Sequence, residues 1–480
     1  MRPVPLVLRL LRQRGFIIQE VMMKKLISLL LCAAIVLGLA SCGSVQNNTA
    51  PQNTGNAAVP TGGYQLSSLK LPSSVKLPDP EDYKDYEAYN KAYSQWRNYL
   101  VEKWELAKSY LNEDGTSMLD KYLRASTAFI EGREGENAVY SPINIFFALS
   151  MLAECTGGET QAQILNVLGF KDTESLRKIC AALWEENYFD AGPYTELLGA
   201  SLWMNSSADL NMDTIAALAM YYYAEGYKGD PLDGGFNAAF KKWLDDKTGG
   251  LLKDQIDQLD DFDPNMLMTI ATTIYFKGAW MSSFSPEANK EDVFHTPGGD
   301  ITTTFMNKLS GMAYYSGDGF RSVSLPFSGA GEMCVILPDE GTTPEALIKS
   351  GAVMDLLLSG EYSSGSTQVR LSIPKFDVSS DLDLIPAAED LGIKDAFNES
   401  VSDFSPLTKM NGAYVSRIKH DARVKIDEEG CEAAAFTVIS IDTRAMMPDD
   451  IIEIKIDRPF VFAITGADGL PMFIGVVNVI

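Results

Sequence analysis

The hydrophobic residues of this chain follow helical and strand periodicities that alternate from residue 112 to the C-terminus. Apolar positions three and four residues apart predict helices over 119–132, over 157–170 and, beginning near Pro142, over the second half of 137–158. Short runs rich in β-formers and closed by Gly or Pro predict strands over 269–280, 323–327, 332–338 and 369–376. This mixture of helices and strands predicts an α+β domain with sizeable sheets.

The C-terminal segment predicts a hairpin. Residues 453–480 contain two apolar runs, and Gly466-Ala467-Asp468-Gly469 separates them. A turn of Gly and Asp between two such runs is typical of antiparallel strands.

An aromatic stripe precedes the main domain. Between residues 79 and 104, aromatic and apolar residues recur at steps of three and four, which predicts a helix with one aromatic face. Such a face fits a glycan or a partner. It also fits the protein's own surface, against which stripes of this kind more often pack.

The N-terminal part has the pattern of an export signal. Residues 23–42 combine two lysines, an apolar run and a small-residue cleavage site. The run from Leu26 to Ala40 is shorter than the ~20 residues that span a bilayer. Its ending, Leu39-Ala40-Ser41-Cys42, is similar to a bacterial lipoprotein signal, which implies lipidation at Cys42.

We therefore predict four segments. Residues 1–41 are an upstream extension with the signal peptide, 42–78 a flexible tether, 79–111 the aromatic helical extension and 112–480 the main domain. A chain with this leader is expected outside the cytoplasm, held to a membrane of a bacterial cell envelope or surface by its lipid anchor.

Composition excludes several functions. The net charge is −24, from 64 acidic and 40 basic residues, which argues against nucleic-acid binding. The chain has only two histidines, His295 and His420, and it lacks HExxH, paired CxxC, GxSxG and GxxxxGK[ST] motifs. We predict no metal, no cofactor and no enzymatic activity.

Residues 428–436, EEGCEAAAF, carry the most unusual pattern in the chain. Side chains alternate between the two faces of a strand. From 431 to 441 the odd-numbered positions are Cys, Ala, Ala, Thr, Ile and Ile, whereas the even-numbered positions from 432 to 442 carry Glu432 and Asp442. A strand of this composition can bury one uncharged face and leave the acids in water.

The order of motifs over residues ~112–480 resembles the serpin family of serine protease inhibitors. The motifs that carry this resemblance are Asn137–Pro142, Thr269–Trp280, Phe305-Met306, Leu325–Phe327, Ile373–Phe376, Leu391–Ile393, Asp403–Ser405, His420–Ala422, Glu428–Ala435 and Arg458–Phe460. The resemblance implies one large mixed central β-sheet, two smaller sheets, about nine helices and an exposed reactive-centre loop.

The resemblance also implies a mechanism. A target serine protease cuts the exposed loop as a substrate, and the cut loop then enters the central sheet as an extra strand. The implied partner is a serine protease, with trypsin-like specificity because family spacing from Glu428 reaches the Arg444–Ala445 bond. The lipid anchor at Cys42 adds the membrane as a second expected partner. Loop length varies within the family, so Thr443, Met446 and Met447 remain alternatives. We expect a monomer.

The resemblance assigns two groups of residues to this mechanism. The insertion hinge, residues 428–435, consists of Glu428, Glu429, Gly430, Cys431, Glu432, Ala433, Ala434 and Ala435. The sheet-opening region consists of Ser141, Asn144, Thr272, Trp280 and His420. We expect His420 to bond across the separating strands, with Thr272 where the family commonly has asparagine and Asn144 where it has serine.

Four cysteines lie in the main domain: Cys155, Cys180, Cys334 and Cys431. Export and an even number permit disulfides. Their apolar contexts instead predict buried thiols, and a disulfide at Cys431 would block insertion.

Two other functions remain as alternatives. A non-inhibitory serpin would use its loop or the aromatic helix as a binding module. An enzyme using Ser, Asp and His420 is disfavoured, because no nucleophile elbow accompanies that histidine.

Overall fold

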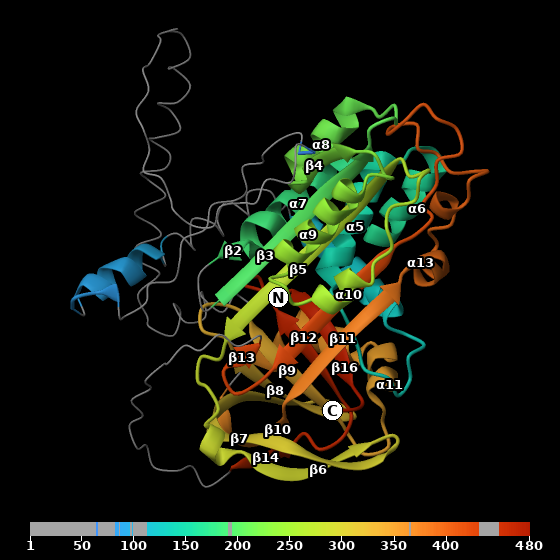
Figure 1. Ribbon diagram of the computed structural model, residues 1–480. Helices are drawn as coiled ribbons and strands as arrows, with labels where there is room; N and C mark the ends of the chain where they lie inside the picture. Colours follow the sequence, from blue (N-terminus) through green and yellow to red (C-terminus); the bar gives the residue numbers. More distant parts are fainter. Residues whose placement is uncertain are drawn as a thin grey trace. The chain divides into compact units, whose positions relative to one another are not determined.

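A computed structural model describes residues 64–65, 82–85, 87–96, 98, 113–190, 194–363, 366–431 and 451–480 (Figure 1). The predicted signal peptide with Cys42 lies outside these residues. So does the loop from Glu432 to residue 450, which contains Arg444 and Ala445.

The central sheet has seven strands in the order β11-β12-β13-β5-β3-β2, and β4 also pairs with β3. The strands are β2 Phe189–Asp190, β3 Tyr194–Asn205, β4 Glu225–Gly229, β5 Met268–Ala279, β11 Phe376–Asp383, β12 Lys419–Ile426 and β13 Gly430–Cys431. The pairs are antiparallel except β3 with β4. β13 lies within the predicted insertion hinge, residues 428–435.

The remaining strands form two smaller sheets that share β7. One runs β1-β16-β15-β9-β8-β7, and in the other β7 pairs with β6 and β10, and β10 with β14. The strands are β1 Ala138–Tyr140, β6 Lys290–Thr296, β7 Gly299–Ser316, β8 Phe320–Pro326, β9 Glu332–Pro338, β10 Thr367–Pro374, β14 Ile452–Lys455, β15 Phe460–Thr465 and β16 Pro471–Val477. β15 and β16 form the predicted C-terminal hairpin and are buried throughout.

Ten α-helices, α4 to α13, lie within the described part of the main domain, and two of them, α10 and α11, are very short. The helices are α4 Glu113–Ala125, α5 Pro142–Cys155, α6 Gly158–Leu168, α7 Thr173–Asn187, α8 Met212–Tyr222, α9 Gly234–Lys247, α10 Lys253–Asp257, α11 Pro344–Lys349, α12 Ala352–Ser359 and α13 Ile385–Leu391. The predicted α+β class with one large and two smaller sheets is confirmed.

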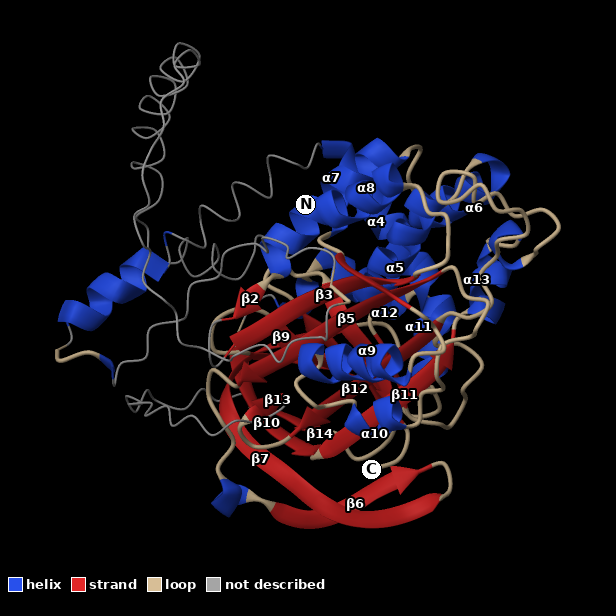
Figure 2. Ribbon diagram, turned by 45° about the horizontal axis from the view of Figure 1, so that its top comes forward, coloured by secondary structure: helices blue, strands red, loops and turns tan. Residues whose placement is uncertain are grey.

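Helices α5 and α9 pack on opposite faces of the central sheet. α5 begins at Pro142, as predicted, and it is buried between β5 and β16. Its N-cap is Ser141, whose hydroxyl accepts from the Asn144 amide at 3.2 Å. α9 lies across β3 and β5 on the other face (Figures 1 and 2).

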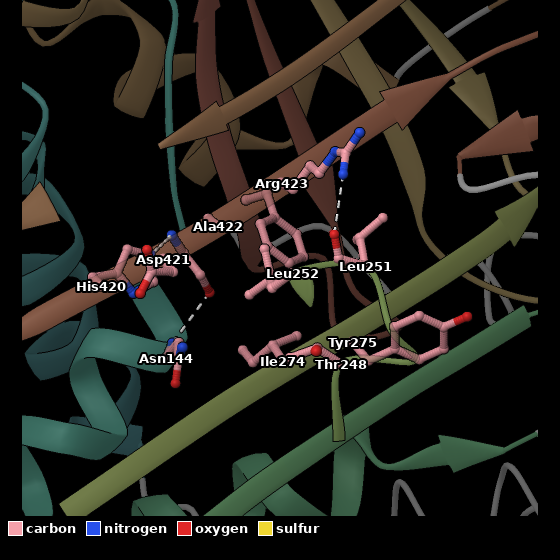
Figure 3. A pocket seen from close by; sticks show the side chains of 12 residues that line it. Asn144, Thr248, Leu251, Leu252, Ile274, Tyr275, His420, Asp421, Ala422 and Arg423 are labelled. Atoms are coloured by element: carbon pink, nitrogen blue, oxygen red, sulfur yellow. Dashed lines mark hydrogen bonds between the residues drawn. The ribbon is translucent and has the colours of Figure 1, made fainter. Parts of the chain in front are cut away.

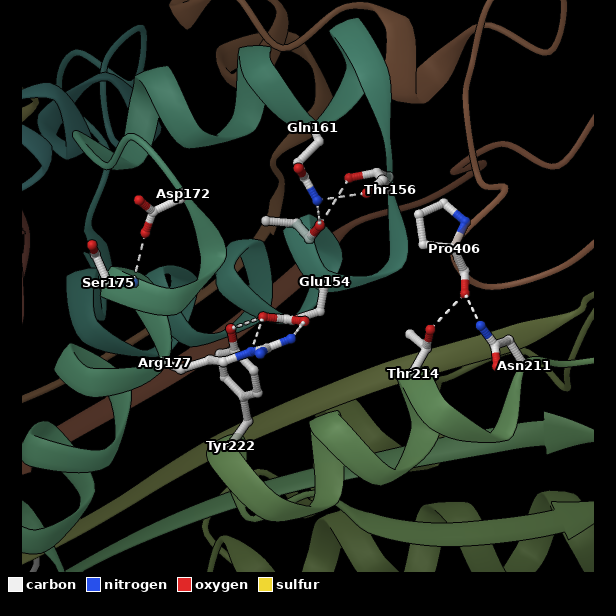
Figure 4. Close-up of polar contacts among 11 residues, drawn as sticks. Glu154, Thr156, Gln161, Asp172, Ser175, Arg177, Asn211, Thr214, Tyr222 and Pro406 are labelled. Atoms are coloured by element: carbon white, nitrogen blue, oxygen red, sulfur yellow. Dashed lines mark hydrogen bonds and ion pairs between the residues drawn. The ribbon is translucent and has the colours of Figure 1, made fainter.

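A buried charge network joins three helices on the α5 side (Figure 4). The Glu154 carboxylate of α5 is 5% exposed and accepts both Nε and Nη2 of Arg177 in α7, each at 2.8 Å. The Tyr222 hydroxyl of α8 donates to the same carboxylate at 2.9 Å. A bidentate guanidinium with a further donor offsets the cost of burying the carboxylate.

The predicted aromatic helix is present in part. Residues 87–96 are helical, and the rings of Tyr89, Tyr93 and Trp96 follow one another at centroid distances of 5.9 and 5.7 Å. Trp96 is 5% exposed, whereas Tyr89 and Tyr93 are half-buried, so only one end of this face is covered. In the part of the chain that the structure describes, no helix has the length and apolarity needed to cross a membrane.

Candidate functional site

Two residues of the predicted insertion hinge, Gly430 and Cys431, lie inside the central sheet as β13. A tight turn over Asp427–Gly430 joins β12 to β13, and the Asp427 carboxylate accepts from the amides of Glu429 and Gly430 at 2.9 and 3.3 Å. Cys431 pairs with Ile426 of β12 on one side and with Gly278 of β5 on the other. The hinge therefore begins as a strand between β12 and β5.

Glycine is required at position 430 by close backbone contact. A Cβ atom at this position would lie 2.1 Å from the Gly278 carbonyl oxygen and 2.9 Å from the Ala279 Cα. A larger residue would push the hinge away from β5.

Trp280 and Glu428 fix the turn from outside. The Trp280 indole donates to the Asp427 carbonyl at 2.9 Å, and its ring stacks on Phe327 at 5.0 Å. The Glu428 carboxylate bonds Lys375 and Asn289, each at 2.5 Å. Trp280 thus lies beside the turn that begins β13, separate from the other four residues of the predicted sheet-opening region.

Those four residues, Ser141, Asn144, Thr272 and His420, meet at the N-terminus of α5. The Ser141 amide donates to His420 Nε2 at 2.9 Å. The Thr272 hydroxyl donates to the Asn144 carbonyl, and the Asn144 amide group donates to the Thr272 carbonyl, both at 3.4 Å. His420 of β12 and Thr272 of β5 therefore do not bond each other as expected. Each bonds a residue at the N-terminus of α5 instead, because that helix end offers backbone partners between the two strands.

Burial determines the state of His420. Its side chain is 4% exposed, and desolvation lowers its pKa from 6.5 to about 4. A neutral ring that accepts at Nε2 carries its proton on Nδ1. At neutral pH the ring is therefore uncharged, and its Nε2 lone pair is occupied by the Ser141 amide.

Below the hinge, β5 and β12 diverge. In the described residues these two strands are joined in the sheet only through the two-residue β13. The loop Thr248–Leu252, which follows α9, lies over the opening, and a small cavity there is lined by Asn144, Leu251, Leu252, Tyr275, His420 and Arg423 (Figure 3). We call this opening between β5 and β12 the gap.

Arg423 holds the loop over the gap. Its Nη1 donates to the Leu251 carbonyl at 3.2 Å, and its Nε and Nη2 bind the Asp377 carboxylate at 2.8 and 2.7 Å. Neither Arg423 nor this loop was predicted from the sequence. Their only signal was Thr248-Gly-Gly-Leu-Leu252, a glycine pair and two apolar residues ahead of an acidic stretch.

The edge of the gap carries a carboxylate that is partly protonated near neutral pH. Asp421 of β12 lies directly opposite Asp381 of β11. Burial, and next the charge of Asp381, raise the pKa of Asp421 to about 6, against the opposing charges of Lys419 and Arg417.

The four cysteines of the main domain have the predicted character. Cys155, Cys180, Cys334 and Cys431 are buried, and no disulfide joins these residues in the described part of the chain. Nor do the described residues contain a group of three or more His, Cys, Asp or Glu side chains arranged to hold a metal ion.

Replacing Asp421 by asparagine should stabilise the protein at pH 7.5. Folding disfavours the ionised carboxylate, so the contribution of Asp421 to stability is complete below pH 3.8 and is lost as the pH rises through about 6. We expect Asp421→Asn to raise the free energy of unfolding by about 2 kcal/mol at pH 7.5 and to have little effect near pH 4, measured as thermal midpoints.

His420 also titrates in this range, because its lowered pKa removes stability as the pH falls from 6.5 toward about 4. Both chains carry His420, so its contribution cancels when the variant and the parent chain are compared at the same pH. Asp390→Asn, at an exposed carboxylate on α13, is the control and should change neither midpoint. A gain for Asp421→Asn that is the same at both pH values would contradict the assignment.

Comparison with known proteins identifies the family of this chain. The family model described as Serpin (serine protease inhibitor) matches residues 122–479. Serpin-Z1C of Triticum aestivum is 27% identical over 71% of this chain and 90% of its own length, and antithrombin-III of Ovis aries is 27% identical over 75% and 78%. The crystal structure of the thermophilic serpin tengpin in its native state has a TM-score of 0.68 and 26% identity, and it covers 77% of this chain and 95% of tengpin. The chain belongs to the serpin family.

Proposed function

We propose that this serpin is a suicide inhibitor of trypsin-like serine proteases outside the cytoplasm. Serpins are in general inhibitors rather than enzymes, although some are non-inhibitory. The observation that carries the proposal is β13, because the hinge occupies the first position of a strand that fits between β5 and β12.

Continuing the observed register assigns a partner to each later hinge residue. Ala433 would lie opposite Val424 and Phe276, and these two side chains are 2% and 4% exposed. Ala435 would follow opposite Ala422 and Ile274. These positions belong to the uncharged face of the hinge, which would thus point toward α5 and the core.

The other face meets charges of opposite sign. In the same register Glu432 would lie between Lys277 of β5 and Lys425 of β12. Phe436 would lie beside Asp421, on the face where Leu251 and Leu252 now line the cavity. The uncharged face of the hinge and Glu432 on its other face are therefore complementary to the walls of the gap.

Insertion of this strand is downhill. Each ladder hydrogen bond adds about 0.5–1.5 kcal/mol net, and about ten residues would form them on both sides. The hinge must first displace the loop over the gap, so the uninserted form persists as a kinetic state. Cleavage of the reactive-centre loop removes the restraint of β14 on the far end of the loop.

Specificity follows from the residue at the scissile bond. Arg444 would present a guanidinium to the protease, which suits a specificity pocket that ends in a carboxylate. We assign the cut to Arg444–Ala445, with the acyl bond formed to the Arg444 carbonyl.

The proposed location rests on the N-terminal sequence. A lipidated Cys42 and the tether after it would hold the inhibitor at the outer side of a cell membrane. There it would meet secreted proteases and avoid cytoplasmic ones.

Trypsin should form a complex with the protein that survives SDS and heat. Mass spectrometry of the released product should find cleavage after Arg444, and Arg444→Leu should move inhibition from trypsin to a chymotrypsin-like protease. Plain cleavage by every protease of a panel, with no covalent complex, would favour the binding-module alternative.

The two faces of the hinge should respond oppositely to the same substitution. Ala433→Glu puts a carboxylate against Val424 and Phe276, so insertion should stall and at least about tenfold more inhibitor should be cut per protease trapped. Ala434→Glu is the matched control, because that residue would face Arg423, and it should keep near-normal stoichiometry. Equal effects of the two variants would refute the register.

Cys42→Ser should release the protein from membranes. In cells that export it, the parent chain should sediment with the membrane fraction and incorporate labelled fatty acid, and the variant should do neither. Trypsin inhibition should be unchanged, since Cys42 lies far along the chain from the hinge. Retention of the variant in the membrane fraction would exclude Cys42 as the anchor.

A further inference from the structure

A short piece of the N-terminal tether is bound to the edge of the central sheet. Gln65 forms an antiparallel bridge with Tyr227 of β4, and the Lys228 amide donates to the Tyr64 carbonyl at 2.9 Å. β4 pairs with β3 along its other edge. Tyr64–Gln65 therefore adds to β4 as the beginning of a further strand.

The Tyr64 side chain binds the N-terminus of α9. Its hydroxyl donates to the carboxylate of Asp233, the N-cap of this helix, which also accepts from the Gly235 amide at 2.9 Å. A Cβ atom on Gly235 would lie 3.0 Å from the Tyr64 hydroxyl oxygen, so the absence of a side chain there admits the phenol.

The Tyr64 ring completes an aromatic cluster beneath α9. It packs edge-on against Phe236 at a centroid distance of 5.3 Å. Phe236 packs in turn on Trp203, and Trp203 stacks on Tyr227 at 4.1 Å. One residue of the tether thus links α9 to β3 and β4 through both polar and apolar contacts.

α9 is the helix whose C-terminal end leads into the gap. The loop Thr248–Leu252 follows it directly and lines the cavity between β5 and β12 with Leu251 and Leu252. The C-terminal half of α9 is itself held to β4, because Lys247 and Glu225 form an ion pair at 2.5 Å. Any strand that fills the gap must move this loop, and with it the end of α9.

We propose that Tyr64–Gln65 is a latch, bound in cis to β4 and α9, that slows insertion of the reactive-centre loop. While the latch is bound, α9 is fixed at its first turn as well as its last, and the loop stays over the gap. When the latch is released, α9 loses its N-terminal brace and the gap opens more easily. This inference rests on the proposed function, because a latch matters only if a strand inserts.

Hydrogen exchange on the full-length protein tests the binding of the latch. The Lys228 amide should be protected in the parent chain and should exchange roughly tenfold faster in Tyr64→Ala, since its acceptor segment has lost its anchor. Tyr64→Phe, which keeps the ring but loses the bond to Asp233, should lie between the two. Tyr93→Ala, in the helix over 87–96, is the control and should leave Lys228 protected.

The rate at which the uncleaved protein inserts its own loop tests whether the latch slows insertion. On warming, uncleaved Tyr64→Ala should convert to a heat-resistant, inserted form several-fold faster than the parent chain, followed by native gel and thermal midpoint. Unchanged protection at Lys228, or lost protection with an unchanged conversion rate, would overturn the latch. If the parent chain never gains heat resistance even when its loop is nicked, the proposed function fails instead, and the exchange result still reports whether Tyr64–Gln65 binds.

Discussion

The structure depends on an incomplete hydrogen-bond ladder at the centre of its largest sheet. β5 and β12 converge at β13 and separate below it in the described residues. Backbone groups at such a break must find other partners. At the N-terminus of α5, the Asn144 side-chain amide donates to the Thr272 carbonyl of β5, and the Ser141 amide donates to the His420 ring of β12. The loop after α9 covers the other side.

The two walls of the break differ in chemistry, and this difference restricts what can fill it. Toward α5 the walls are apolar, with Phe276, Ala422 and Val424 all buried. Toward α9 they carry Lys277, Asp421, Arg423 and Lys425. Only a strand with one small apolar face and one polar face satisfies both walls. The alternation from Cys431 onward offers an uncharged face on one side and carries both of its acids, Glu432 and Asp442, on the other.

Local patterns in the sequence predicted much of the fold, because they depend on neighbours along the chain. The start of α5 at Pro142, the C-terminal hairpin and the buried cysteines all follow from short runs of residues. The aromatic stripe likewise predicted a helix over 79–104, and of the residues described there 87–96 are α-helical whereas 82–85 are not.

The contacts that the sequence did not predict depend on how segments far apart in the chain are aligned with one another. Asp381 and Asp421 become partners only through the pairing of β11 with β12, and Tyr64 meets β4 across a long stretch of chain. The bonds of His420 and Thr272 to α5, in place of a bond to each other, depend on where a helix end lies between two strands. No periodicity within one strand records such placements.

The position of the last two strands determines what happens to the polypeptide when its loop is cut. β15 pairs with β9 on one side and β16 on the other, and β16 pairs in turn with β1. Both strands are buried along their whole length. After a cut in the loop, the short C-terminal fragment would therefore stay bound to the rest of the protein through these buried strands. The cut would alter the shape of the molecule but would not release the fragment.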